Sequence, residues 1–437
     1  MLRRLLPLAC LALTACQTAT PLAALPGALP PGLSGDRTGE VVVGFQPTAD
    51  DAARATLRAR FGAQASRGVT PNAEWWQVPA GQEAAIATAL AAEPAVKFAQ
   101  RNHLRRLPTE LTFTGVEAPA FKLMDSAVND PLYPRQWHLP RCAFPAAWER
   151  STGAGVIVAV IDSGVDPQHP DLAPHLLPMI DEVVAFGRHD MIGKTNYDGR
   201  DGHGHGTHVC GLVGALRNNA IGVVGGAPDA TILPIKVTAN DGETDDATIA
   251  KGITDAVDKG ARVLNLSIGG PEPSPLLLEA LNVAFAKDAA VCIASGNDGG
   301  KVNYPAAYAG VIAVGSLTAM GGVASYSSRG SDLVVIAPGG GAPGSQEGEQ
   351  VLSTTPTYDC YLTTRGGKPK DYGGQAGTSM SSPLVSALAA LVISAYPTLS
   401  GAQVRTRIAA ACEDLGGAGF DDASGWGVIN AARAVAP

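Results

Sequence analysis

The hydrophobic and polar positions of this chain follow two different patterns, which meet near residue 130. Before that point, the pattern predicts strands at 41–45, 75–78 and 96–100 and helices at 50–61 and 82–91. This order of elements in so short a stretch is typical of a small α+β unit, in which a sheet carries helices on one face. Residues 40–107 are therefore expected to form a small domain of their own.

After residue 130, continuous apolar runs replace the alternating ones. They predict strands at 156–161, 231–237, 263–268, 290–294 and 311–314, separated by helical segments near 205–216, 244–258, 274–287, 378–395 and 401–411. Such runs are typical of parallel strands that are buried on both faces. The expected fold class is α/β, a doubly wound and mainly parallel sheet preceded by the small α+β domain. In such sheets, ligand sites lie beyond the carboxyl ends of the strands.

The first 15 residues predict a signal peptide, because Arg3 and Arg4 precede an apolar core at 5–13 that is too short to span a bilayer. The segment Leu13-Thr14-Ala15-Cys16 is similar to a bacterial lipobox, whose cysteine is acylated after cleavage. The alternative is an ordinary signal peptide followed by an incidental cysteine. Export follows from both, and acylation of Cys16 predicts a lipid-anchored precursor in the bacterial cell envelope.

Composition and charge narrow the picture further. Residues 16–39, rich in Ala, Pro, Thr and Gly, predict a tether, and residues 108–128 predict a linker. The 52 Gly and 32 Pro make up about a fifth of the 437 residues, below the ~25–30% of disordered chains. The net charge of -8 is spread without a basic stripe, which argues against a nucleic-acid partner. After residue 16 no apolar run reaches the roughly 20 residues of a membrane span, so membrane contact is expected only through the lipid.

Five cysteines remain after the signal peptide and the proposed lipid site. An odd number in an oxidising compartment implies at least one free thiol, and the pairing cannot be deduced from the sequence. Cys292 lies inside an apolar run and is expected to be a small buried hydrophobe. The set is Cys142, Cys210, Cys292, Cys360 and Cys412.

Three segments place reactive side chains where the sheet predicts a site. Asp162 directly follows the strand at 156–161, His205 opens a helix after a Gly-rich approach, and Ser379 stands at the start of another helix. A hydroxyl needs a base within hydrogen-bond reach and a carboxylate that orients the base before it becomes a good nucleophile. Asn297, after the strand at 290–294, offers an amide donor for the oxyanion that forms when Ser379 attacks a carbonyl.

These motifs resemble those of the subtilisin-like serine proteases, the subtilases. The matching segments are Asp162-Ser163-Gly164, His205-Gly206-Thr207-His208-Val209, Ser295-Gly296-Asn297 and Gly377-Thr378-Ser379-Met380, in the family's order of Asp, His and Ser. The resemblance covers residues 129–437 and implies a monomeric serine endopeptidase that hydrolyses protein or peptide substrates through an acyl-enzyme. Cys210 and Leu384 depart from the usual pattern beside the motifs, and Cys210 suggests sensitivity to mercurials.

The resemblance also implies roles outside the triad. Residues 40–107 are similar to the inhibitor-type propeptide that assists folding and then blocks the active site, with the processing site inside 108–128; an unrelated small domain is the alternative. The segments expected to bind substrate carry no acidic side chain, which predicts a broad preference for apolar or aromatic residues before the cleaved bond. They comprise Ser267, Ile268, Gly269, Gly270, Ala294, Ser295, Gly296 and Asn303.

A structural calcium ion is the cofactor that the resemblance implies. Such an ion takes six to eight oxygen ligands, which a turn carboxylate and an Asn-rich loop can supply. The alternative is that the acidic side chains merely belong to turns. The candidate ligands are Asp130, Asp171, Leu216, Asn219, Ile221 and Val223.

Two other functions compete with a serine protease. His203, His205, His208 and Cys210 lie close enough in sequence to suggest zinc, but no acidic general base stands between them and the motifs around Asn297 and Ser379 would be unexplained. A lipid-tethered binding protein that uses the same fold without catalysis is the second rival.

Overall fold

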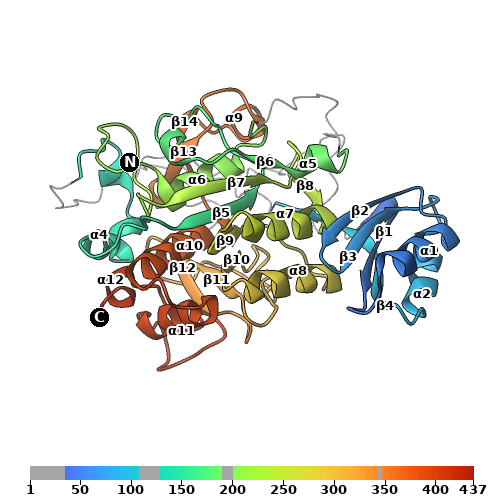
Figure 1. The fold of residues 1–437 in the computed structure, drawn as a ribbon. Coiled ribbons are helices and arrows are strands. Elements are labelled where there is room, and N and C mark those ends of the chain that lie inside the picture. Colours follow the sequence, from blue (N-terminus) through green and yellow to red (C-terminus); the bar gives the residue numbers. More distant parts are fainter. Residues whose placement is uncertain (1–34, 108–127, 189–199, 342–346) are drawn as a thin grey trace, which may run out of the picture. The chain divides into compact units, whose positions relative to one another are not determined.

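The computed structural model describes residues 35–107, 128–188, 200–341 and 347–437. The predicted signal peptide, Cys16, most of the tether and nearly all of the linker at 108–128 lie outside these ranges. Two sheets of five and seven strands organise the described chain, together with a hairpin of β13 (Val351–Thr355) and β14 (Asp371–Gln375) (Figure 1).

The five-stranded sheet has the order β2-β3-β1-β4-β8. Four of its strands come from the N-terminal domain, whereas the fifth, the short β8, belongs to the second domain. The N-terminal domain consists of β1 (Asp36–Phe45), α1 (Asp51–Arg60), β2 (Ala65–Thr70), β3 (Ala73–Gln77), α2 (Glu83–Ala91) and β4 (Val96–Arg106). Asp50 caps α1 by accepting a hydrogen bond from the backbone N–H of Ala53.

Both faces of β1 are buried, which explains its continuous apolar sequence. Val41, Val43 and Phe45 pack in the small core of the N-terminal domain, whereas Val42 joins the large core of the second domain. Side chains alternate between the faces of a strand, so this split follows from the pleat. We refer to residues 36–107 as the prodomain from here on, after the propeptide role that the sequence analysis predicts for them. Its sheet packs against α7 (Asp246–Asp258) and α8 (Pro275–Ala286).

The seven-stranded sheet has the order β12-β11-β10-β9-β5-β7-β6, and its strand pairs are parallel. This arrangement confirms the predicted α/β class. The strands, in the order of the sheet, are β12 (Val335–Pro338), β11 (Ile312–Leu317), β10 (Ala290–Ala294), β9 (Val263–Leu266), β5 (Ile157–Asp162), β7 (Thr231–Lys236) and β6 (Ile180–Asp181).

Helices cover the parallel sheet, and α10 (Thr378–Ala395) lies at its centre in contact with β9, β10, β11 and β12 (Figure 1). By length and composition α10 could cross a membrane, but 89% of it is buried inside the fold, as in a core helix. The remaining elements are α3 (His138–Arg141), α4 (Phe144–Trp148), α5 (Glu182–Ala185), α6 (His205–Gly214), β8 (Glu243–Asp245), α9 (Tyr361–Thr364), α11 (Gly401–Ala411), α12 (Ala431–Ala434) and 3-10 turns at Tyr133–Arg135, Ala173–His175 and Glu347–Glu349.

The observed boundaries differ from the expected ones mainly around the prodomain. β1 begins at Asp36, inside the predicted tether, and β4 continues to Arg106 rather than ending near residue 100. Both extensions carry charged residues that pair with the second domain, so no hydrophobic period marks them. β2 and β8 were not predicted, because neither has an apolar run of its own. The prediction also missed β6, β12, β13 and β14 of the second domain.

Candidate active site

Asp162 and His205 meet at the carboxyl end of β5. Asp162 is the last residue of that strand, and its Oδ1 lies 2.8 Å from Nδ1 of His205, the first residue of α6. Both side chains are buried, and Asp162 Oδ1 also accepts the backbone N–H of Ser163 at 2.7 Å. A carboxylate in this position can hold the imidazole with Nε2 unprotonated and ready to accept a proton.

Asp201 organises the start of α6, where no side chain caps the helix directly. Its Oδ1 accepts the N–H groups of His203 and Gly204, and its Oδ2 accepts the N–H and hydroxyl of Thr207. Gly206 lets this turn approach the strand, since a Cβ there would lie 2.2 Å from the carbonyl oxygen of Gly164. The buried Asp201 carboxylate therefore fixes the position of His205.

Ser379 lies in the first turn of α10, which packs against α6. Within the described part of the chain, its Oγ is buried and has no hydrogen-bond partner. Pro383 lacks the N–H that would bond the carbonyl of Ser379 four residues earlier, and the hydroxyl of Ser267 donates to that carbonyl instead, at 3.1 Å. The same hydrogen bond links Ser379 to the segment predicted to bind substrate.

Asn297 is oriented as an oxyanion donor requires. Its Oδ1 accepts both the N–H and the hydroxyl of Thr378, at 2.9 and 2.8 Å, so the amide nitrogen is turned the other way. Gly377, with φ +141°, leaves room for that nitrogen, because a Cβ at this position would come within 2.8 Å of it. The residue before Thr378 must therefore be glycine for two reasons, space and backbone conformation.

The predicted substrate-binding residues form two adjoining walls. Gly270 exchanges backbone hydrogen bonds with Tyr304, and the N–H of Asn303 donates to the carbonyl of Ser295 at 2.9 Å. The side-chain amide of Asn303 lies 2.5 Å from where a Cβ of Gly296 would be, so this glycine is also required by space. The structure brings together Ser267, Ile268, Gly269, Gly270, Ala294, Ser295, Gly296 and Asn303 beside Ser379 and Asn297.

The end of the prodomain runs between one of these walls and β8. Arg106 forms an antiparallel bridge with Gly269, and the N–H of Leu107 donates to the carbonyl of Gly242 at 2.9 Å. A Cβ on Gly242 would contact both Leu107 and the ring of His203, which itself lies 6.2 Å from the ring of His205. The tail thus adds a strand to two backbone edges beside His205, as an extended peptide would.

Comparison with known proteins decides what this arrangement belongs to. A sequence model of the subtilase family matches residues 153–427. Subtilisin DY from Bacillus licheniformis is 38% identical over 283 residues, which cover 64% of this chain and 90% of that protein. The chain belongs to the subtilase family. Thermitase from Thermoactinomyces vulgaris is 34% identical to this subtilase over 309 residues, 70% of this chain and 98% of that protein.

A solved structure extends the likeness into the prodomain. Fervidolysin from Fervidobacterium pennivorans, described as a keratinolytic enzyme related to subtilisin, superposes with a TM-score of 0.75 at 26% identity, over 92% of this chain and 61% of that one. The predictions of the family, of the fold and of a serine endopeptidase are therefore confirmed. The roles of individual residues are taken up below as proposals.

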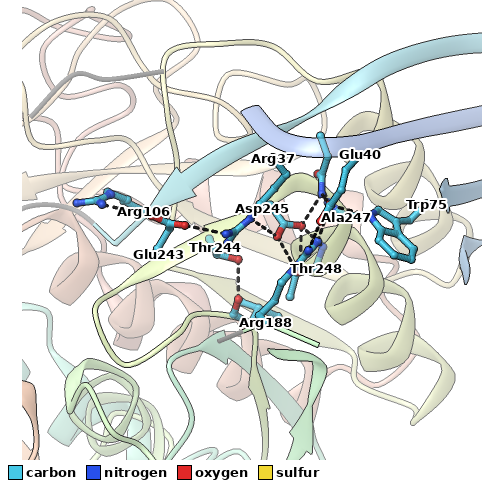
Figure 2. A network of polar contacts seen from close by, with 12 residues as sticks. Arg37, Glu40, Trp75, Arg106, Arg188, Glu243, Thr244, Asp245, Ala247 and Thr248 are labelled. Atoms are coloured by element: carbon cyan, nitrogen blue, oxygen red, sulfur yellow. Dashed lines mark hydrogen bonds and ion pairs between the residues drawn. The ribbon is translucent and has the colours of Figure 1, made fainter. Parts of the chain in front are cut away.

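A buried polar network joins the prodomain to the rest of this subtilase (Figure 2). Asp245, which caps α7, binds Arg37 of the prodomain at 3.2 Å and Arg188 at 2.8 Å. Arg188 also pairs with Glu40, which in turn accepts the indole N–H of Trp75 at 2.7 Å. Burial alone would raise the pKa of Asp245, but the charges of Arg188 and Arg37 outweigh it and hold that pKa below its usual value.

The predicted calcium ligands lie together but form hydrogen bonds among themselves. Asp171 accepts the amide nitrogen of Asn219 at 2.6 Å and the N–H of Val223 at 3.0 Å, and the oxygen of Asn219 accepts the N–H of Ile221. Rotating the Asn219 amide by 180° would place its oxygen next to the Asp171 carboxylate and its nitrogen next to the N–H of Ile221, and both contacts would be repulsive. Asp130 accepts the N–H groups of Asn218 and Asn219 in the same way. Leu216 contributes its N–H to the carbonyl of Asp171.

The nitrogen of the Asn219 amide, rather than its oxygen, therefore faces Asp171, which is the reverse of what a cation bound between the two side chains would need. The backbone carbonyls of Leu216, Ile221 and Val223 take no part in these hydrogen bonds. Burial raises the pKa of Asp171, although hydrogen bonds from Asn219 and Val223 oppose that rise. Among the residues that the structure describes, no group of three or more His, Cys, Asp or Glu side chains is placed to hold a metal ion. His208, one of the zinc candidates, instead directs Nε2 at the carbonyls of Val351 and Gly373, at 3.1 Å each.

The five described cysteines are unpaired. Cys210 has no exposed surface and burial raises the pKa of its thiol, so the suggested sensitivity to mercurials through this residue is not supported. Cys292 is buried in β10, as expected.

Three residues have roles at the site that the sequence analysis did not identify. An acid that precedes a Gly-rich helix start is a capping signal, and this signal could have identified Asp201. His203 stacks on Tyr361 of α9, with ring centroids 4.9 Å apart, and Asp246 lies in the groove that holds the prodomain tail. The last two depend on contacts between distant segments, which no local pattern reveals.

Proposed function

We propose that this subtilase is an exported endopeptidase that is made as a proenzyme and processes itself. The observation that carries the proposal is the 2.8 Å contact between Asp162 and His205, next to the helix that presents the buried Ser379 hydroxyl. Ser379 attacks the peptide carbonyl, and His205 Nε2 takes the hydroxyl proton. Asp162 accepts the Nδ1–H of His205 and stabilises the imidazolium that forms.

The oxyanion then lies between two donors. Asn297 supplies its side-chain N–H, and the backbone N–H of Ser379 supplies the second, at the positive end of the α10 dipole. His205 returns the proton to the leaving amine, and water hydrolyses the acyl-enzyme by the reverse sequence of steps. The pocket walls at Ala294–Gly296 and Asn303 support a preference for apolar or aromatic residues before the cleaved bond.

The prodomain acts as a folding aid and an inhibitor in this proposal. Its tail at 104–107 occupies the substrate groove by strand pairing, and its sheet covers α7 and α8. The processing site is proposed within 108–128, directly after the tail. The enzyme is proposed to act as a monomer on protein or peptide substrates.

Acylation of Cys16 gives the anchor to the prodomain rather than to the enzyme, because any cut within 108–128 lies after it. We expect a membrane-bound precursor and a soluble mature enzyme. Cell fractionation of the native chain and of Cys16→Ser tests this, since only the former should appear in the membrane fraction before processing. Mature enzyme found solely in membranes would contradict the proposal.

The deciding experiment is the intact mass of three purified proteins. The wild type should lose its N-terminal region, whereas Ser379→Ala should remain whole. Ser394→Ala is the matched control, because this serine lies at the far end of the same helix and bonds only the carbonyl of Ala154 in the hydrogen bonds described for it. A wild type that stays whole and resists a serine-directed phosphonate probe would favour the tethered binding protein instead.

Calcium is not part of the proposed chemistry. The loop at Leu216–Val223 is held by protein hydrogen bonds to Asp171 and Asp130, and no step of the reaction needs a cation.

A further inference from the structure

The substrate groove holds an arginine side chain in a buried ionic pocket. Arg105 of the prodomain tail directs Nε at Asp246 Oδ1, 2.8 Å away, and a terminal guanidinium nitrogen at the carbonyl oxygen of Glu272, 2.7 Å away. The side chains of Arg105 and Asp246 are 2% and 0% exposed. We propose that this pocket is a substrate subsite, and that the enzyme selects protein substrates with arginine at the position of Arg105.

The backbone of the tail shows that this position belongs to the groove. Leu104, Arg105 and Arg106 pair antiparallel with Asp245, Thr244 and Glu243 of β8. Arg106 also bridges Gly269, two residues from Ser267, whose hydroxyl donates to the carbonyl of Ser379. A peptide that reaches Ser379 through the same two edges must place one side chain where Arg105 lies, two residues before the residue that pairs with Gly242.

The pocket is complementary to a guanidinium in shape as well as in charge. Gly270 borders it, and a Cβ at this position would come within 2.8 Å of a terminal nitrogen of Arg105, so the missing side chain makes room for the arginine. One wall offers a carboxylate to Nε and the other a carbonyl to the terminal nitrogen. A lysine, with a single point charge, can satisfy one of these acceptors well but not both in the same geometry.

Removal of the prodomain gives the pocket its selectivity. Arg105 and Gln100, which also bonds Asp246 at 3.2 Å, both leave with the prodomain. A substrate side chain at this position covers the Asp246 carboxylate again, and an arginine compensates the buried charge whereas an apolar side chain does not. The mature enzyme should therefore discriminate at this position.

The ion pair of the next tail residue, Arg106 with Glu243, provides an internal comparison for the Arg105 pocket. Arg106 lies 3.4 Å from Glu243, and its side chain is 38% exposed. Exposed ion pairs of this kind contribute little because water and salt screen them. The selectivity should therefore be confined to the Arg105 position, even though both positions of the tail carry arginine opposite an acid.

The inference rests on the proposed function and is tested with mature enzyme and quenched fluorescent peptides. The peptides carry residues 102–107 followed by one common cleavable sequence, with Arg, Lys or Leu at the position of Arg105, or Leu at that of Arg106. We expect kcat/KM to be about tenfold or more higher for Arg than for Leu at the first position, with Lys between them. Replacement at the second position should change kcat/KM by less than about threefold.

Two variants assign the selectivity to Asp246. Asp246→Asn, which keeps the shape of the side chain, should lose the preference for arginine, so that the ratio of kcat/KM between the arginine and leucine peptides falls towards one. Glu279→Gln is the matched control, because Glu279 pairs with Lys97 of the prodomain at 2.7 Å outside the groove, and it should keep the wild-type ratio.

The possible failures are distinguishable. Equal cleavage of the arginine and leucine peptides by active wild-type enzyme would overturn the subsite and leave the proposed function intact. Cleavage of no peptide at all, with no reaction towards the phosphonate probe, would overturn the proposed function itself. If Asp246→Asn does not mature, the wild-type peptide series still decides, because it needs no variant.

Discussion

Three histidines of the catalytic domain are buried as neutral bases. Burial lowers the pKa of His138, His203 and His208 to about 3 each, and the nearby charge of His205 adds to the effect for the last two. In the unfolded chain these groups titrate near 6.5. Between pH 6.5 and 3 the unfolded state therefore binds more protons than the folded state, and stability falls as the pH falls through this window.

His138→Phe should remove one third of this acid sensitivity. Neither ring nitrogen of His138 has a hydrogen-bond partner among the described residues, so an apolar ring loses no bond. We expect the drop in unfolding free energy between pH 7 and pH 5 to shrink by about 2 kcal/mol. Urea titrations at both pH values in the Ser379→Ala background, where self-digestion is absent, measure it. An unchanged drop would mean that His138 is protonated in the native state.

Asn297→Ala should affect the rate far more than substrate binding, because the donor acts on charge that develops only in the transition state. The expected fall in kcat is on the order of 10²–10³, the loss that removal of one such side-chain donor causes in subtilisin, with KM nearly unchanged. Steady-state kinetics on a peptide substrate check it. A rise in KM at constant kcat would instead assign Asn297 to ground-state binding.

The sequence left open whether the loop at Leu216–Val223 binds calcium. Hydrogen bonds to Asp171 and Asp130 hold this loop in place without a cation. Treatment of purified enzyme with EGTA should therefore leave the melting temperature unchanged, as calorimetry with and without added calcium would show. A clear fall on chelation would establish the calcium site that the family resemblance implied.

The segment at 182–188 contacts β2 and β3 of the prodomain. Phe186 packs edge-on against Trp75, with ring centroids 5.8 Å apart, and its face receives the guanidinium of Arg67 at 4.9 Å. Arg67 also donates to the carbonyl of Ala185 at 2.7 Å. This short segment thus supplies an aromatic anchor of the kind that dominates binding energy at interfaces.

Phe186→Ala should weaken retention of the cleaved prodomain by about 30-fold or more, which corresponds to about 2 kcal/mol for loss of an aromatic anchor. Gel filtration of matured enzyme, with the bound prodomain measured by mass, provides the readout. Phe420→Ala is the control, since that exposed ring contacts Trp426 far from the prodomain in sequence and contact. Equal retention by both variants would show that the anchor contributes little.

The sequence predicted those helices and strands that have a strong apolar pattern or capping residues of their own. The strand at Ala290–Ala294 and the helices at Thr378–Ala395 and Gly401–Ala411 were placed at their observed bounds, because each has a strong apolar period or cap. Asp162, His205 and Ser379 could be singled out as candidates because each lies in a local motif at an element end. β8 and the roles of Asp246 and Arg188 could not, because a three-residue strand and buried ion pairs acquire meaning only from the segment that packs on them.

The described chain has two hydrophobic cores, a large one in the second domain and a small one in the prodomain. The prodomain core contains few large side chains, and the edge of its sheet at β4 is completed by β8 of the other domain. Ion pairs at Asp245 and Asp246 add to this dependence. A small domain with an open edge and a limited apolar core is marginally stable by itself.

Residues 35–107 expressed alone should therefore show little regular structure. Circular dichroism should detect folding when mature enzyme carrying Ser379→Ala, obtained by cutting the variant precursor with another protease, is added. Arg105→Leu in the isolated segment should bind more weakly but fold to the same content at saturation. A prodomain that is fully folded alone would show that its own core suffices.

The sharing of β8 has a consequence for the time course of activation. One edge strand cannot pair with the prodomain tail and with a substrate at once, so a molecule becomes competent only when its tail departs, and a competent molecule can digest the tails that its neighbours release. Each activation thereby accelerates the next. A solution of the precursor should therefore pass from no activity to full activity after a lag. This lag should become shorter as the protein concentration rises, so the local concentration of the enzyme controls when proteolysis begins.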